Sequence, residues 1–577
     1  MGSHNLELVF DRVGHFGRFQ IVLYFICAFQ IISCGIHYLA SVFMLFTPHH
    51  TCKPPGNVSQ ILSYDLSTWN LENMFAMLTP AQKNNVTVQL HNGEIWELSK
   101  CTRVQKENTS QFKGRYSSGK TDLLCLDGYI YDRSQWKSTV VTEWNLVCHR
   151  RWFAQLIQPG FMLGVMLGSL IFGYLADRRG RRPVLWSTGI GMFLFGITVA
   201  FTTDYYSFMG ARFFLAMMTS GYVVVVFVYV TEIIGMKSRT WASMQLHSFF
   251  AIGAVLVALT AYVVRTWWLY QLILSTVTIP FIMCCWILPE TPFWLLSKGR
   301  YREAQNVVDM IARWNGTRSY KLSELLSLDL SEFTHNKPSK TEKHSLCELF
   351  RDCDITTRTL ILWLVWFTAS LGFYTLALNT YSLGGNEYLN FFLLGLAEIP
   401  AYTLVCICID RVGRRNAMVF FLFSSSLTCG LIVVIPQNYY PWGLVASLTG
   451  KFAIGAVFGL IYLYTAELYP TVVRCLAVGS SSMVCRVANI LVPFTVFLSS
   501  IWIFIPQLCV GILACLSGLL TLSLPETFRK PLETTWKEPE KPKSIKDISL
   551  STLLSTTTNL GLEKIEVINS RDSGLEE

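Results

Sequence analysis

The sequence predicts an all-α membrane protein of twelve transmembrane helices, arranged as two parallel six-helix halves with a large extracellular loop. Composition is the first reason, because 52% of the 577 residues are hydrophobic and only 15% are charged. A soluble chain of this size carries roughly a quarter charged residues. The second reason is a series of apolar runs of about twenty residues, the length at which a helix crosses a bilayer. The third is an internal repeat.

The repeat centres on a short basic segment that occurs at residues 177–182 (DRRGRR) and again at 410–415 (DRVGRR). The basic segment repeats at an offset of 233 residues, and two further landmarks repeat at 235 and 236: a glutamate with an arginine seven positions on, and the tripeptide Pro-Glu-Thr (Glu232 and Arg239, Glu467 and Arg474, 289–291 and 525–527). The copies therefore run in the same direction. Basic turns containing glycine are typical of short cytoplasmic connections, and two such halves around a central site are typical of secondary transporters.

The order of segments follows from the apolar runs. Residues 1–18 are expected to be cytoplasmic, and 19–46 is too long for a signal-peptide core and predicts the first transmembrane helix. The rest of the N-terminal half should occupy 151–288, with spans near 152–175, 184–202, 206–232, 240–263 and 267–288. The C-terminal half should occupy 358–524, with spans near 358–380, 388–409, 417–436, 441–466, 472–497 and 500–524. Twelve spans place both termini in the cytoplasm, and residues 525–577 are expected to form a disordered cytoplasmic tail.

The polar insertion 47–150 is predicted to be extracellular, glycosylated and closed by disulfides. It holds three Asn-X-Ser/Thr acceptor patterns and four cysteines (Asn57, Asn85, Asn108; Cys52, Cys101, Cys125, Cys148). Their clustering in one loop favours the oxidising, glycosylating side of the membrane. Four cysteines allow three pairings, and the sequence does not choose among them.

The second polar stretch, 289–357, is predicted to be a cytoplasmic helical linker between the halves. Apolar residues recur in it at helical spacing (Ala304, Val307, Val308, Ile311, Ala312). One apolar stripe on a charged helix predicts a helix that lies against the membrane domain.

Composition and motifs also limit the function. The net charge of +9 does not indicate nucleic-acid binding, because the basic residues lie mainly in turns and cytoplasmic loops, as the positive-inside rule expects. The chain has no P-loop, no His-Glu-X-X-His zinc spacing and no nucleophile elbow. An enzyme or an ATP-driven pump is therefore disfavoured, and no cofactor or metal is expected. The expected partners are a small-molecule substrate and the lipid bilayer.

Three segments resemble the organic cation, anion and carnitine transporters of solute carrier family 22, within the major facilitator superfamily. They are 138–148 (STVVTEWNLVC), 289–296 (PETPFWLL) and 464–474 (YTAELYPTVVR), and the similarity extends from about Phe10 to Thr527. Asn145 stands where the family usually has aspartate. The resemblance implies the major facilitator fold and a transport function, and the chain looks most like the family's carnitine transporters.

Ionisable residues deep in a span are costly and are therefore candidate site residues. Arg486 lies twelve residues beyond Arg474, about 18 Å into the membrane. The resemblance places it where anion and carnitine carriers have arginine, and a guanidinium suits a carboxylate. Glu398, at similar depth, is expected to attract a cationic group or to pair with Arg486. Lys451 is expected to attract an acidic group or to extend toward the membrane surface.

Aromatic residues supply the remaining substrate candidates, because quaternary ammonium groups bind to aromatic faces. The resemblance places four of them on cavity-lining helices (Phe373, Tyr374, Tyr38, Tyr462). The repeated charged residues are predicted instead to form a cytoplasmic gate that biases a conformational switch (Asp177, Arg178, Arg181, Arg182, Glu232, Arg239, Asp410, Arg411, Arg414, Arg415, Glu467, Arg474).

The sequence thus favours a plasma-membrane carrier that moves carnitine and related zwitterions or organic cations by alternating access. An organic anion transporter is the alternative within transport, since Arg486 and Lys451 would both serve one. A non-transporting receptor or scaffold is the alternative outside it.

Overall fold

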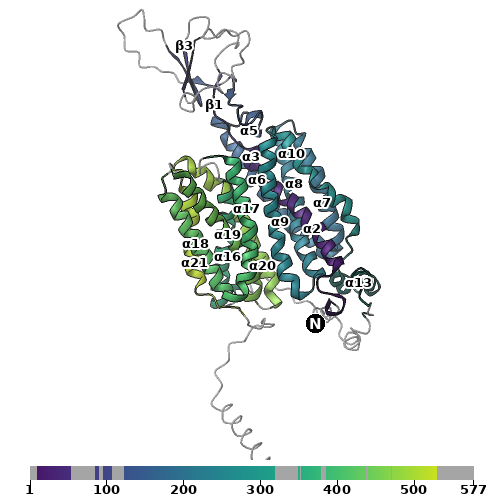
Figure 1. Cartoon of the computed structure of the whole chain (residues 1–577). Helices are drawn as coiled ribbons and strands as arrows, with labels where there is room; N and C mark the ends of the chain where they lie inside the picture. Colours follow the sequence, from purple (N-terminus) through teal and green to yellow (C-terminus); the bar gives the residue numbers. More distant parts are fainter. Residues whose placement is uncertain are drawn as a thin grey trace, which may run out of the picture.

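A computed structural model describes residues 10–53, 85–89, 95–106, 123–125, 127–318, 322, 349–350, 352–378, 385–436, 439–469 and 471–528. Two bundles of long helices stand side by side, and a small group of strands projects beyond one end (Figure 1). We call that end the loop side and the opposite end, where helix α13 lies, the linker side.

The first bundle contains six predicted spans. The first is α2 (Arg18–Leu39) with the short α3 (Ser41–Met44), and the sixth is divided into α10 (Trp267–Thr276), α11 (Ile279–Cys284) and a 3-10 turn (Cys285–Ile287). Pro280, in the first turn of α11, cannot donate a backbone hydrogen bond, which accounts for the break. The four spans between them are continuous: α6 (Arg151–Arg179), α7 (Arg181–Ala200), α8 (Tyr205–Ile233) and α9 (Met236–Val263).

The second bundle repeats this order with α16 (Cys353–Leu378), α17 (Glu387–Val412), α18 (Arg414–Val434), α19 (Tyr440–Leu468), α20 (Thr471–Phe497) and α21 (Ile505–Thr521). Within the described residues, eleven helices are long and apolar enough to cross a membrane, and Ile505–Thr521 is a shorter apolar helix. The predicted span 500–524 is therefore too long at both ends, because a 3-10 turn at 498–500 and irregular residues precede α21.

The two bundles meet along α9 and α17 and along α6 and α20. The seam is tight where glycine allows close approach, since a side chain at Gly395 of α17 would press on Ala254 and Val255 of α9. On the loop side, rings of Phe43 and Tyr388 stack at 5.3 Å between centroids. These contacts bring the two halves together around a shared interior.

The insertion 47–150 contains strands that the sequence did not predict. One sheet pairs β1 (His50–Cys52) with β6 (Tyr129–Tyr131), and the other has the antiparallel order β2 (Asn85–Gln89), β3 (Ile95–Ser99), β4 (Thr102–Lys106), β5 (Leu123–Leu124). Of the three possible cysteine pairings, the structure has Cys52 with Cys125 and Cys101 with Cys148. Asn57 and Asn108 lie outside the described residues, as does the side chain of Asn85.

The linker helix has the predicted apolar face. Helix α13 (Tyr301–Asn315) buries the same five residues of the stripe, and Trp314 lies edge-on to Phe19 of α2 at 5.5 Å. Asn315 ends the helix and accepts a hydrogen bond from the backbone N–H of Phe19 at 3.0 Å. The helix therefore lies against the first bundle, while the predicted disordered tail falls almost wholly outside the described residues.

Candidate functional site

On the linker side of the first half, the side chain of Glu290 binds the turn that joins α6 to α7. Its carboxylate accepts hydrogen bonds from the backbone N–H groups of Arg181 (2.9 Å) and Arg182 (3.1 Å), which are free because they open a helix. The Arg181 guanidinium pairs with Glu232 at 3.0 Å, and Thr291 donates to Glu232 at 2.6 Å. One connected cluster thus joins the ends of α6, α7 and α8 to the start of the linker.

The second half builds the same cluster. Glu526 accepts from the backbone N–H groups of Arg414 (2.9 Å) and Arg415 (3.1 Å). Arg414 pairs with Glu467 at 3.2 Å, and Thr527 donates to Glu467 at 2.6 Å. Gly180 and Gly413 occupy the two turns at φ 106° and 95°, and a side chain at either would collide with the glutamate. Both turns therefore require glycine.

The remaining predicted gate residues make fewer contacts with these two clusters, or their side chains lie outside the described residues. Asp177 pairs with Arg181 at 3.1 Å but its side chain is 77% exposed, and Arg178 and Arg411 are exposed. Arg182 lies over the Trp186 ring at 4.5 Å, whereas Arg239 is partly buried. The side chains of Asp410 and Arg474 fall outside the described residues.

Sequence reasoning missed the role of Glu290 and Glu526. Their tripeptides stood out as repeated landmarks, and this repetition was the available signal. The pairs of Arg181 with Asp177 and Glu232 lie within the first half, and the pair of Arg414 with Glu467 lies within the second. These contacts stabilise the linker-side end of each half.

The interior between the halves contains Arg486 of α20. Its electrostatic neighbours are the hydroxyls of Tyr38, Tyr374 and Tyr462 and the thiol of Cys485. Tyr38 and Tyr374 come from opposite halves, and their rings stack at 6.3 Å. The predicted site residues Arg486, Tyr38, Tyr374 and Tyr462 are thus brought together.

Arg486 has no counter-ion in the part of the chain that the structure describes. No carboxylate there lies within ion-pair distance of its guanidinium, and its Nε has no hydrogen-bond partner. The side chain nevertheless keeps 8% of its surface accessible, against 1% for Glu398 and Lys451. A permanent positive charge therefore lies in the interior and is slightly more accessible than the pair Glu398–Lys451.

The proposed pairing of Glu398 with Arg486 is wrong. Glu398 of α17 pairs instead with Lys451 of α19 at 2.9 Å. Lys451 is buried and does not extend toward the membrane surface. Its ammonium also donates to the carbonyl oxygen of Phe373 at 2.8 Å and lies 3.3 Å from the centroid of that ring. Glu398, Lys451 and Phe373 thus form a second group of predicted residues.

Aromatic rings connect the two groups. Phe373 contacts Tyr374 at 5.2 Å and Phe458 at 5.5 Å, and Phe458 contacts Tyr462 at 5.9 Å. The first half contributes Phe227, stacked on Tyr462 at 6.1 Å, and His247, 5.2 Å from Tyr402. Four rings of this cluster (Phe227, His247, Tyr402, Phe458) were not predicted, because one aromatic residue in an apolar span gives no sign of which way it faces.

A further buried arginine, Arg212 of α8, was also missed, although it is the only arginine in its apolar run. It is 1% exposed and its guanidinium lies between the rings of Phe161 (5.1 Å) and Phe208 (5.7 Å). Cation–π contacts of this kind stabilise a desolvated guanidinium. It lies toward the loop side of the first half, and Phe161, which it contacts, is also 5.5 Å from the ring of Tyr38.

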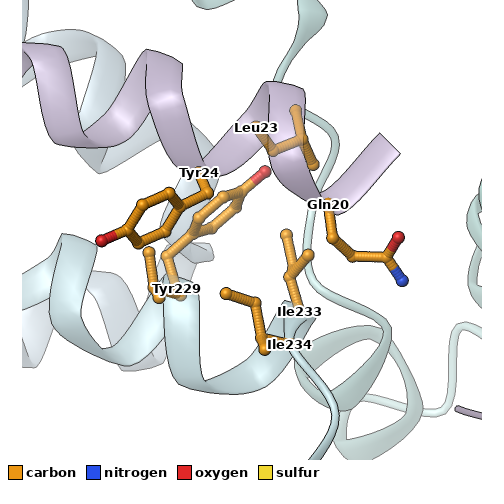
Figure 2. A pocket seen from close by; sticks show the side chains of 7 residues that line it. Gln20, Leu23, Tyr24, Tyr229, Ile233 and Ile234 are labelled. Atoms are coloured by element: carbon orange, nitrogen blue, oxygen red, sulfur yellow. The ribbon is translucent and has the colours of Figure 1, made fainter. Parts of the chain in front are cut away.

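Two hollows lie away from the central residues. Figure 2 shows a crevice between α2 and the end of α8, lined mainly by aliphatic and tyrosine side chains, that leaves no room for a water molecule. A groove of about 250 Å³ lies on the linker side between the end of the sixth span and α13, and its lining includes Arg182, Glu290 and Glu303. Neither contains a predicted substrate residue.

Comparison with known proteins agrees with this architecture. Residues 145–537 match the family model "Sugar (and other) transporter". The proton:xylose symporter XylE shares the fold, with a TM-score of 0.54 and 16% identity over 67% of this chain and 89% of that chain. The fold is therefore that of the major facilitator superfamily.

Curated relatives are far more similar in sequence. Solute carrier family 22 member 16 of Homo sapiens is 65% identical over the whole of both chains, and that of Xenopus laevis is 51% identical over 97% of this chain and 99% of its own. Organic cation/carnitine transporter 2 of Homo sapiens is 33% identical over 92% and 94%. The chain belongs to solute carrier family 22 and is a multi-pass membrane transporter rather than an enzyme.

Proposed function

We propose that the protein is a plasma-membrane carrier that moves carnitine and related zwitterions, or organic cations, by alternating access. The observation that carries this proposal is Arg486, a buried guanidinium beside three tyrosines that has no counter-ion among the described residues. A zwitterion with a carboxylate and a quaternary ammonium a few ångströms apart complements such a site, because the guanidinium binds the carboxylate and the rings hold the ammonium. The name of one relative, organic cation/carnitine transporter 2, supports the same substrate class.

The arrangement favours a zwitterion over a dianion. An organic anion carrier would use both Arg486 and Lys451, but the charge of Lys451 is balanced by Glu398 at 2.9 Å. One uncompensated positive charge suits one carboxylate. The Phe373 face is covered by Lys451, so the rings of Tyr374, Tyr38 and Tyr462 are the nearer surfaces for the ligand's ammonium group.

The proposal includes orientation. The loop side would be extracellular, with Asn57, Asn85 and Asn108 glycosylated and the two cysteine pairs oxidised, and both termini and α13 would be cytoplasmic. The charged clusters would then act as the cytoplasmic gate, biasing the two conformations of the transport cycle.

Uptake of labelled carnitine, tetraethylammonium and a dicarboxylate in one expression system tests this function. We expect carnitine uptake in the wild type. Arg486→Ala should lower the uptake efficiency for carnitine by a factor equivalent to about 2–4 kcal/mol, since a charged hydrogen-bond partner is lost. Tetraethylammonium has no carboxylate, so its transport should be spared. Arg486→Lys keeps the charge but loses the planar fork and should still weaken carnitine uptake.

Surface biotinylation supplies the control for folding. Equal loss of both substrates at normal surface level would contradict a carboxylate contact. Absence of carnitine uptake in the wild type, with robust dicarboxylate uptake, would favour the anion carrier instead.

A further inference from the structure

The chain's own ammonium group occupies a complete cation site. Lys451 Nζ lies 3.3 Å from the centroid of Phe373, donates to the backbone oxygen of that residue at 2.8 Å and pairs with Glu398 at 2.9 Å. A ring face, a carbonyl oxygen and a carboxylate are the groups that bind an organic ammonium. Two helices supply these groups: α16 the ring face and the carbonyl oxygen of Phe373, and α17 the carboxylate of Glu398, while α19 carries Lys451.

The Glu398 carboxylate has one oxygen that can still accept a hydrogen bond. Glu398 is 1% exposed, and its Oε2 has no hydrogen-bond partner among the described residues. A buried carboxylate is costly without a cation, and Lys451 is the cation that balances it here. The ring of Phe373 is 5.2 Å from that of Tyr374, a neighbour of Arg486, so this pair adjoins the proposed carboxylate site.

We propose that Lys451 is a tethered competitor that keeps a latent organic-cation site closed and so makes the substrate's carboxylate necessary for tight binding. A cation without a carboxylate gains nothing from Arg486 and reaches Glu398 and Phe373 only by displacing Lys451. Displacement leaves a buried ammonium unpaired, which is unfavourable. A zwitterion anchored on Arg486 does not need to displace it. This inference rests on the proposed function and assigns Lys451 as its specificity-determining residue.

Lys451→Met tests the inference, because methionine preserves much of the side-chain length and removes the charge. Glu398 and Phe373 are then open to an external cation. We expect the apparent affinity for tetraethylammonium to rise about tenfold or more, and that for carnitine to change by less than about threefold. Binding is measured by the thermal shift of the purified full chain and by uptake.

Two matched variants separate the cation site from a general loosening of the core. Lys451→Met combined with Glu398→Gln removes both charges of the pair, so the gain for tetraethylammonium should disappear. Lys451→Met combined with Phe373→Leu keeps the carboxylate but removes the ring, and the gain should shrink. Lys451→Gln, whose amide can still donate to Glu398, replaces the methionine variant if that variant does not reach the surface.

An unchanged affinity for tetraethylammonium in a well-expressed Lys451 variant would overturn the inference. An equal gain in the double variant without the carboxylate would overturn it as well. Neither result depends on carnitine, so failure of the proposed function, seen as absent carnitine uptake in the wild type, is distinguishable from failure of this inference.

Discussion

The charged clusters on the linker side are built alike in both halves, whereas the central site is not. Glu290 and Glu526 each accept two backbone hydrogen bonds at 2.9 and 3.1 Å, and Thr291 and Thr527 each donate at 2.6 Å. In the centre, Arg486 and the pair Glu398–Lys451 all come from the second half. The first half contributes rings and an imidazole there.

This difference separates two functions. Both halves must pack and move as units during alternating access, so an arrangement that stabilises helix ends is useful twice. A small asymmetric ligand has one carboxylate, and a single guanidinium serves it. Contacts present in both halves therefore point to a role in conformational change, and contacts present in only one half point to recognition of the ligand.

The largest effect expected from this comparison is at the two acceptor glutamates. Glu290→Gln and Glu526→Gln each remove the negative charge that receives two backbone N–H groups, interactions worth about 1–3 kcal/mol when charged. We expect each to lower the maximal uptake rate about tenfold, with little change in apparent affinity. Initial-rate uptake over a range of carnitine concentrations measures both quantities.

Glu303→Gln is the matched control, because Glu303 is exposed and pairs with Arg300, the residue just before α13, at 2.6 Å. It should change the rate by less than about twofold. A tenfold loss at Glu290 with none at Glu526 would break the equivalence of the two halves.

A smaller effect is expected at the aspartates of the repeated basic segment. Asp177 is 77% exposed where it meets Arg181, and ion pairs at the protein surface contribute about 0–1 kcal/mol. Asp177→Asn should slow transport by no more than about twofold, and Asp410→Asn should match it by the repeat. Apparent affinity at the cell surface should be unchanged. Loss of affinity with a preserved rate would argue against a gate role.

Glu232→Gln sharpens the same comparison. Glu232 also pairs with Arg181, at 3.0 Å, but is only 18% exposed. Replacing Glu232 should therefore slow transport more than replacing Asp177. Equal transport rates in the two variants would mean that burial of an ion pair does not determine its contribution to the cluster.

The smallest functional effect is expected in the insertion 47–150, which belongs neither to the linker-side clusters nor to the central site. Intact cells treated with a glycosidase should show a shift in electrophoretic mobility, and replacing Asn57, Asn85 and Asn108 together should abolish that shift. Transport per surface molecule should be unchanged, because these sites lie in the loop and not among the central residues. A persistent shift would contradict the extracellular placement.

Periodicity and repetition in the sequence determined the helices, the two halves and the amphipathic linker helix. The five buried residues of α13 are those of the predicted stripe, because a helix places such residues on one face whatever it packs against. The positions of Arg486, Glu398 and Lys451 along their helices can likewise be read from the sequence, since helical rise converts residue number into distance.

Only the tertiary structure decided which of these residues are partners. Glu398 and Lys451 lie on different helices, and the rotation of those helices about their axes directs the two side chains toward each other, so that Arg486 has no carboxylate partner among the described residues. The same holds for Glu290, which meets Arg181 from 109 positions away. Depth is a property of one helix, whereas a contact depends on how two helices are rotated and packed, and that is set by the whole interface rather than by local sequence.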